Sequence, residues 1–112
     1  MTYLSHAGAR STLTKTPSNV VVEAGTDATL ECSSDISAIS ITWDYDGNRV
    51  VGPGCTSLAY TLSQYVTEST VNDCHLTAVG NYTVEGVYGC TDGSGKTAQA
   101  VVVVVGNLIH SE

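Results

Sequence analysis

The sequence predicts an all-β protein in which two sheets stack face to face. Three observations lead to this prediction: Val, Thr and Ile are abundant, short segments alternate apolar and polar residues, and Gly or Asp-Gly separates these segments at short intervals. No stretch of useful length has the 3.6-residue period of an amphipathic helix. About seven or eight short strands bury their apolar faces only when two sheets pack together.

The clearest strands lie in the first half of the chain. Three segments alternate in the manner of half-buried strands, and they are residues 18–25, 27–33 and 39–45. Their inward-facing side chains are expected to be Val20, Val22, Ala28, Leu30, Cys32, Ile39, Ile41 and Trp43. Each of these segments thus offers one apolar face to a common core.

A tight hairpin is expected next, because Asp46-Gly47 supplies the positive φ that two-residue turns need. A short strand over residues 49–51 should return beside residues 39–45, and the sequence Gly-Pro-Gly at 52–54 should end it. Four further strands are expected over residues 57–66, 69–79, 84–90 and 96–105, and the last two should form a hairpin.

A chain of 112 residues corresponds to one domain. We expect an irregular N-terminal segment over residues 1–15, the folded domain over 16–106, and a linker or frayed C-terminus over 107–112. No apolar run approaches the roughly 20 residues that span a bilayer. Residues 1–15 also lack the apolar stretch of a signal peptide. If the protein is extracellular, we therefore expect this chain to be a module of a longer protein, with any signal or anchor outside this sequence.

The formal net charge is −7, and the four basic residues, Arg10, Lys15, Arg49 and Lys96, are scattered along the sequence. They form no basic stripe that could contact phosphates, so nucleic acid is not an expected partner. Contact of this segment with an anionic membrane surface is not expected either.

Four cysteines, Cys32, Cys55, Cys74 and Cys90, are spaced 16 to 23 residues apart and form no CxxC pair. The three histidines, His6, His75 and His110, stand alone in the sequence. This pattern favours a disulfide framework formed in an oxidising compartment over a zinc site, and we expect no metal and no other cofactor. Four cysteines allow three connectivities, which the spacing alone leaves open.

One set of residues resembles the immunoglobulin superfamily. Cys32 lies on the second strand, Trp43 on the third and Cys90 near the end, with Tyr88 two residues before it. The resemblance implies a two-sheet Greek-key sandwich with a Cys32–Cys90 bridge between the sheets, Trp43 packed on the bridge, and Tyr88 as a tyrosine corner. Leu30 should belong to the same core, and Cys55 and Cys74 are then left to bond each other.

The sequence departs from the family pattern at two places. Val84 stands where an acidic residue usually precedes the second cysteine by six positions, and Glu85 follows it, so the usual ion pair with an arginine is not expected. The Cys55–Cys74 pair is the second departure. The long spacing from Trp43 to Cys90 suggests an intermediate or variable-like set, enlarged between the C′ and E strands.

Three other features of the sequence bear on function: a glycosylation motif, an EF-hand-like start and the histidines. Asn81-Tyr82-Thr83 is an acceptor motif for N-glycosylation in the expected loop between strands E and F. Residues 44–48 begin like an EF-hand, but Arg49 and Cys55 stand where that loop needs Gly and Glu, so we interpret them as a surface hairpin. No histidine has a visible catalytic partner, and His75 is expected at the surface; the domain is therefore not expected to be an enzyme.

The resemblance implies an extracellular recognition module of a cell-surface receptor, such as a receptor tyrosine kinase, or of an adhesion protein. Such a module would bind another protein or a second copy of itself. One alternative is a secreted immune-type binding domain that uses the loops at residues 33–38 and 91–95. The side chains of these loops are mostly small and polar and include no aromatic anchor, so this alternative ranks below the first. A second alternative is a structural module of a filament protein.

The candidate interface is the outer face of the sheet made by the expected G, F and C strands. Tyr88 and Cys90 should point inward, so Val87 should point outward. The last expected strand carries five consecutive valines, 101–105, and the register decides whether Val102 and Val104 or the other three face outward. We take Val87, Val102 and Val104 as the candidate interface residues, since exposed apolar patches commonly mark interaction sites.

Overall fold

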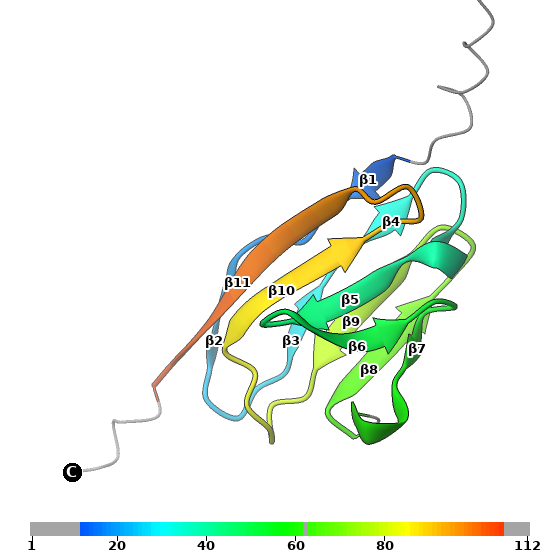
Figure 1. Cartoon of the computed structure of the whole chain (residues 1–112). Helices are drawn as coiled ribbons and strands as arrows, with labels where there is room; N and C mark the ends of the chain where they lie inside the picture. The colour runs from blue at the N-terminus through cyan, green and yellow to red at the C-terminus, as the bar shows by residue number, and fades with distance from the viewer. Residues whose placement is uncertain (1–11, 62, 107–112) are drawn as a thin grey trace, which may run out of the picture.

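The computed structural model describes residues 12–61 and 63–106, in which all the regular strands fall into three sheets (Figure 1). The expected irregular and linker segments at residues 1–11 and 107–112, and with them His6 and His110, lie outside the described residues. The largest sheet has six strands in the spatial order β2, β11, β10, β5, β6 and β7. Their bounds are Val20–Glu23, Thr97–Val105, Gly86–Thr91, Thr42–Tyr45, Asn48–Gly52 and Thr56–Ser57.

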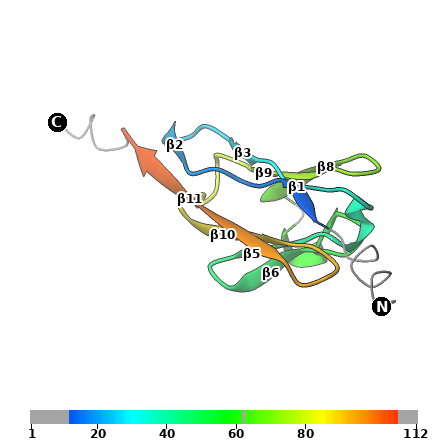
Figure 2. The ribbon, with the colours of Figure 1, turned by 90° about the horizontal axis from the view of Figure 1, so that it is seen from above.

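A three-stranded sheet covers the inner face of the six-stranded sheet, as the view from above shows (Figure 2). Its strands lie in the order β3, β9 and β8, with bounds Ala28–Leu30, Cys74–Ala78 and Tyr65–Ser69. A small third sheet pairs β1, Leu13–Lys15, with β4, Ser33–Ser34. In the six-stranded sheet β2 runs parallel to β11, whereas the other pairs are antiparallel. The fold is the expected all-β, two-sheet sandwich.

The N-terminal boundary needs a correction. Residues 13–15, expected to be irregular, form β1 and pair with Ser33 and Ser34. The folded domain therefore begins before residue 16. The backbone of Thr12 donates to the Asp35 carboxylate over 2.8 Å, and the Asp35 amide donates to the Thr12 carbonyl over 2.9 Å. These long-range hydrogen bonds hold the segment in place, and a local sequence pattern does not reveal them.

The expected strand over residues 39–45 begins later in the structure. Residues Ala38–Ser40 form a single 3₁₀ turn, and the Ser37 hydroxyl caps it by accepting from the Ile39 amide. Ile39, expected inside, is 67% exposed, whereas Ile41 and Trp43 are fully buried as expected. The error has a local cause, because a serine that bonds the backbone two residues on offers an alternative to a sheet ladder.

The expected strand over residues 57–66 is divided between the two layers. Thr56–Ser57 is β7 of the six-stranded sheet, Ala59–Thr61 is a 3₁₀ turn, and β8 begins at Tyr65 in the other sheet. The Thr61 hydroxyl donates to the carbonyls of Leu58 and Val50, over 2.9 and 3.2 Å, which closes the turn. The chain crosses between layers here, so one continuous strand is impossible. The expected strand over 69–79 likewise turns at 70–73 before β9.

The Asp46-Gly47 hairpin is confirmed. Both residues have positive φ, 49° and 86°, and Tyr45 pairs with Asn48 across a two-residue loop. This is the geometry that matches the right-handed twist of the flanking strands. The turn joins β5 to β6 and so places Asp44 opposite Arg49 on one face of the sheet.

Candidate functional site

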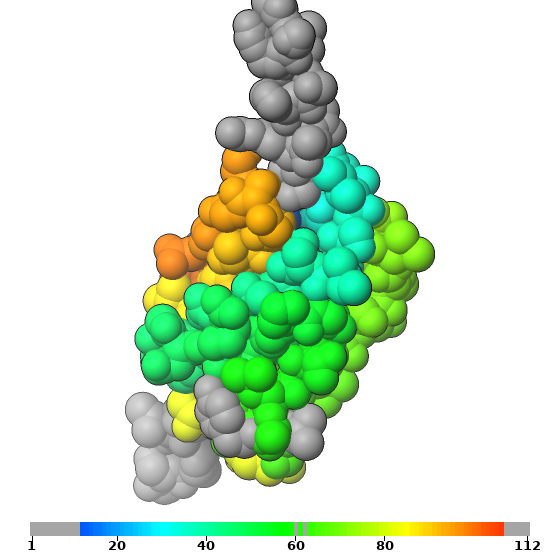
Figure 3. Space-filling model, turned by 45° about the vertical axis from the view of Figure 1, so that its right-hand side comes forward, coloured from blue at the N-terminus to red at the C-terminus, as the bar shows by residue number. Residues whose placement is uncertain are grey.

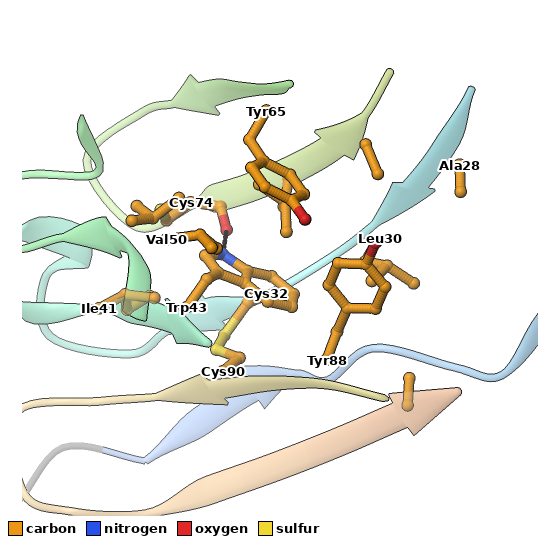
Figure 4. Packing of buried hydrophobic residues seen from close by; sticks show 14 of the residues in the cluster. Ala28, Leu30, Cys32, Ile41, Trp43, Val50, Tyr65, Cys74, Tyr88 and Cys90 are labelled. Carbon is orange, nitrogen blue, oxygen red and sulfur yellow. Dashed lines mark hydrogen bonds between the residues drawn. A yellow bond between two sulfur atoms is a disulfide. The ribbon is translucent and has the colours of Figure 1, made fainter. Parts of the chain in front are cut away.

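A disulfide between Cys32 and Cys90 joins the two layers, with its Cα atoms 6.5 Å apart. Cys90 lies on β10, and Cys32 lies just after β3 in the opposite layer. The fully buried Trp43 ring lies beside this bridge (Figure 4). Leu30, 2% exposed, belongs to the same cluster. The arrangement is the one that the immunoglobulin resemblance implies.

The second disulfide links Cys55 to Cys74, with Cα atoms 5.6 Å apart. Cys55 has a positive φ of 59° in the loop after β6, and Cys74 is the first residue of β9. The bridge therefore joins the loop between β6 and β7, at one edge of the six-stranded sheet, to the start of β9, the central strand of the three-stranded sheet. The indole Nε1 of Trp43 donates to the Cys74 carbonyl over 2.9 Å, so the second bridge holds the acceptor of the core tryptophan (Figure 4).

Tyr88 forms the tyrosine corner. Its ring is fully buried, and its hydroxyl donates to the Val84 carbonyl four residues earlier, over 2.8 Å. The rings of Tyr45 and Tyr65 pack around it, with centroids 5.0 and 6.3 Å from that of Tyr88. Burial raises the pKa of the Tyr88 hydroxyl far above its usual value, and the neighbouring tyrosines add to this shift.

The departure at Val84 and Glu85 has a structural consequence. Val84 is 5% exposed and joins the core, where a carboxylate would lack solvent. Glu85 accepts a hydrogen bond from the Val104 amide over 2.9 Å, and so fastens the loop before β10 to the last strand. Arg49 instead pairs with Asp44 over 2.7 Å on the outer face of the six-stranded sheet.

Ser33, Asp73 and His75 come together without forming a nucleophilic triad. The Ser33 hydroxyl donates to Asp73 over 2.6 Å rather than to the histidine. His75 Nδ1 accepts from the Cys32 amide over 3.2 Å, and Nε2 lies 3.7 Å from Asp73. The hydrogen bond from Ser33 holds the pKa of Asp73 below its usual value. His75, expected at the surface, has a side chain only 14% exposed, because it secures β9 to the segment that carries Cys32.

Within residues 12–61 and 63–106, no group of three or more metal-ligating side chains is close enough to hold an ion. Over the same residues, no helix has the length and apolarity needed to cross a membrane.

The candidate interface needs a correction, because Val102 is fully buried and Val104 is partly buried against the core. In the β10–β11 register Tyr88 faces Ala100, and Gly86 faces Val102. Because cross-strand partners share a face, the even-numbered residues of β11 point inward with Tyr88. The odd-numbered valines 101, 103 and 105 point outward instead.

The outer face of the six-stranded sheet thus carries a row of exposed valines. Val87 pairs with Val101 across β10 and β11, and Val103 pairs with Val21 across β11 and β2. We call this set the valine row; it comprises Val21, Val87, Val101, Val103 and Val105, with exposures from 39% to 64%. Asp44 and Arg49 lie beyond it on β5 and β6.

The outer face of the three-stranded sheet is more polar. A pair of hydroxyls, Thr29 and Thr77, lies there 3.0 Å apart, and Val66 is its exposed valine. Asn81 is exposed in the loop that joins β9 to β10, as the acceptor motif requires for accessibility.

Comparison with solved structures finds one fold repeatedly. A chain in the complex of Dpr1 IG1 with DIP-eta IG1 matches with a TM-score of 0.72 at 14% identity, over 86% of this chain and 96% of that chain. Domain I10 of titin matches at 0.68 and 16%, over 86% of this chain and 99% of that one. The Ig1-2 module of the Drosophila receptor protein tyrosine phosphatase DLAR matches at 0.66 and 18%, over 87% and 50%.

No protein-family model and no curated protein matches the sequence. At these identities the structural likeness establishes the fold. The chain is an immunoglobulin-fold domain, with the disulfide, tryptophan and tyrosine of that fold at Cys32, Cys90, Trp43 and Tyr88.

Proposed function

We propose that this domain is an extracellular recognition module of a cell-surface receptor or adhesion protein, and that the valine row is its protein-binding surface. The observation that carries the proposal is the cross-strand alignment of Val21, Val103, Val101 and Val87 on one sheet face. Contiguous exposed apolar surface of this kind usually marks a site of association.

The Asp44–Arg49 ion pair lies beyond the valine row on the same face and is neutral as a pair, so β5 and β6 add no net charge there through these two residues. A second copy of the domain is therefore the first candidate partner. Solved complexes among the structural neighbours include Dpr1 IG1 with DIP-eta IG1 and titin M10 with an obscurin-like 1 Ig domain. Immunoglobulin folds in these complexes bind other proteins, which supports a binding role here.

Sedimentation equilibrium of the purified domain tests the surface. We expect dimers for the wild type and monomers for Val87→Glu and for Val103→Glu, because each places a charge within the apolar contact. Val66→Glu is the matched control, since Val66 is an exposed strand valine on the opposite sheet, and it should still dimerise. A wild-type domain that stays monomeric at its highest soluble concentration would rule out pairing through this face.

Two disulfides support an oxidising, extracellular location, and the exposed Asn81 supports passage through the secretory pathway. Expression as a secreted protein in animal cells tests whether Asn81 is glycosylated. We expect a glycan on Asn81 that enzymatic deglycosylation removes, and its absence from an Asn81→Gln variant. Secreted protein with unmodified Asn81 would contradict the glycosylation proposal.

A filament module is the second candidate, because several matching structures are titin domains. The two disulfides favour the extracellular alternative. A secreted immune-type domain is less supported, since the turn at Asp92–Lys96 is held by hydrogen bonds to the Asp92 carboxylate and carries no aromatic side chain. We also propose that the domain has no enzymatic role, because Ser33, Asp73 and His75 serve as structural hydrogen-bonding partners.

A further inference from the structure

A hollow of about 360 Å³ lies at one end of the sandwich, where the turn after β2, the loop between β9 and β10, and the end of β11 meet. Its apolar lining comes from Ala24, Val84, Val104 and the ring of Tyr82, and Glu85 is the charged residue among those that line it. Val84 is buried, Val104 is half-buried and Tyr82 is 42% exposed. Figure 1 shows the turn and the loop at the lower end of the molecule, and part of the loop's yellow surface is visible at the bottom of Figure 3.

Asn81 lies beside this hollow, because its neighbours in the chain line it. Gly80 precedes Asn81 and Tyr82 follows it, and both are lining residues. Thr83, the third residue of the acceptor motif, also lines the hollow. Asn81 itself is exposed, as the attachment of a sugar requires. The first sugar of a glycan on Asn81 would therefore be tethered next to an apolar hollow of this same chain.

The loop that carries Asn81 is held firmly against the rest of the domain. The Gly80 amide donates to the Asp27 carboxylate over 2.8 Å, and a Cβ at Gly80 would lie 2.5 Å from backbone atoms of the turn after β2. On the other side of Asn81, the Tyr82 amide donates to the Val79 carbonyl over 3.1 Å. Because the attachment point and the hollow belong to one fixed unit, a tethered sugar has a high effective concentration there, and weak contacts are enough to hold it.

The lining suits the base of an N-linked glycan, which is N-acetylglucosamine. This sugar is uncharged, offers C–H groups and an acetamide methyl group for apolar contact, and donates hydrogen bonds from its hydroxyls and its acetamide N–H. The Tyr82 ring and Val104 provide apolar surface for such contacts. Glu85 provides an acceptor: its Oε1 already accepts from the Val104 amide over 2.9 Å, and a carboxylate has further lone pairs for a sugar donor.

We propose that the N-acetylglucosamine on Asn81 packs into this hollow against Tyr82 and Val104, and that it stabilises the fold there. The inference rests on the proposed glycosylation of Asn81 and adds a defined position for the sugar. The hollow exists only in the folded domain, whereas the unfolded chain carries the same glycan without it. Contacts that form only in the folded state shift the equilibrium toward that state.

The experiment compares melting temperatures of the complete 112-residue chain, secreted from animal cells that make only high-mannose glycans. Three forms are compared: the full glycan, the single N-acetylglucosamine that an endoglycosidase leaves, and the sugar-free Asn81→Gln variant. We expect the first two to melt together and the third to melt about 4 °C lower or more. In NMR spectra of the trimmed form, the acetamide methyl group should show nuclear Overhauser effects to the Tyr82 ring.

Two sets of variants test the position of the sugar. Tyr82→Ser keeps the acceptor motif and removes the ring, so the gap in melting temperature between its glycosylated and sugar-free forms should shrink by about half or more. Glu68→Asn in the Asn81→Gln background is the matched control, since it creates an acceptor motif with Ser69 and Thr70, at exposed positions away from the hollow. This relocated glycan should leave the melting temperature close to that of the sugar-free Glu68→Gln/Asn81→Gln variant.

A glycosylated domain that melts with Asn81→Gln would overturn this inference and leave the glycosylation proposal standing. Equal stabilisation by the relocated glycan would also overturn it, because the effect would then need no hollow. Mass spectrometry measures the occupancy of Asn81 separately, and an unmodified Asn81 would overturn both proposals.

Discussion

The indole nitrogen of Trp43 donates a hydrogen bond to the backbone carbonyl of Cys74, over 2.9 Å and inside the core. The single tryptophan is thereby connected to both disulfides: its ring lies beside Cys32 and Cys90, and its N–H bonds the residue that anchors Cys55 (Figure 4). A ring with a polar edge fills the apolar space and also satisfies a buried acceptor. The position therefore selects tryptophan for two physical reasons.

Substitution of Trp43 separates these two roles. Trp43→Ala should lower the free energy of unfolding by about 3 kcal/mol or more, as for other large core aromatics. Trp43→Phe keeps an aromatic ring but leaves the Cys74 carbonyl unpaired, which should cost about 1–3 kcal/mol. Urea titration followed by circular dichroism measures both. Ile39→Ala is the control, since Ile39 is exposed and its substitution should change the free energy of unfolding by less than about 1 kcal/mol. A change for Trp43→Ala that is as small as this would contradict the core role.

Peptide mapping under non-reducing conditions checks the connectivity. Trypsin together with a glutamate-specific protease separates the four cysteines into peptides 32–49, 50–68, 69–85 and 86–96. We expect 32–49 linked to 86–96, and 50–68 linked to 69–85, as the two disulfides require. Trypsin alone cannot decide the matter, since residues 50–96 contain three of the cysteines. A link from 32–49 to either middle peptide would contradict the structure.

The second disulfide should contribute substantially to stability. Its cysteines are separated by 19 residues, and closure of a loop of that size is worth roughly 3 kcal/mol in the chain-entropy model. The double variant Cys55→Ala/Cys74→Ala should lose about this amount in urea titration and still fold around Cys32–Cys90. Tryptophan fluorescence should keep its buried character, because the acceptor for Trp43 is a backbone group. A loss below about 1 kcal/mol would show that the bridge constrains little.

The raised pKa of Tyr88 predicts an alkaline limit to stability. The unfolded tyrosine loses its proton near pH 10, whereas the buried one holds it, so the unfolded state binds fewer protons above that pH. The contribution of Tyr88 to the free energy of unfolding should therefore be constant below about pH 10. Above that pH it should fall, by up to about 1.4 kcal/mol per pH unit. Denaturation titrations between pH 7 and about pH 11 measure the fall.

Tyr88→Phe should remove this contribution and also cost about 1 kcal/mol or more at neutral pH, because the buried Val84 carbonyl loses its donor. Tyr82→Phe, at a position 42% exposed, is the control and should leave neutral-pH stability unchanged. An alkaline fall that persists undiminished in Tyr88→Phe would assign it to another group.

Gly80 should tolerate no side chain. A Cβ there would lie 2.5 Å from backbone atoms of Gly25 and Thr26, where the loop after β9 crosses the turn after β2. Backbone cannot move aside as a flexible side chain can, so Gly80→Ala should destabilise the domain by about 1–3 kcal/mol. Gly89→Ala is the matched control, since its Cβ would meet nothing closer than 3.8 Å. If the two variants melt at the same temperature, the close approach at Gly80 is contradicted.

The sequence alone determined the features that depend on neighbouring residues and on residue type. Alternation of apolar and polar residues predicted β structure, and Asp46-Gly47 predicted its turn because positive φ is a local property. Cys32, Trp43, Tyr88 and Cys90 predicted the fold class through their order and spacing. The 3₁₀ turn at Ala38–Ser40 also has a local cause, the Ser37 cap, which the alternation of Ile39 and Ile41 concealed.

Only the tertiary structure decided which faces and partners these residues have. Five consecutive valines alternate equally well in either phase, and the pairing of β11 with β10 and β2 alone buries Val102 and exposes Val101 and Val103. The hydrogen bond between His75 and the Cys32 amide and the acceptor for Trp43 likewise arise from segments that are remote in sequence. Strand register and loop contacts are long-range relationships, and no local pattern encodes them.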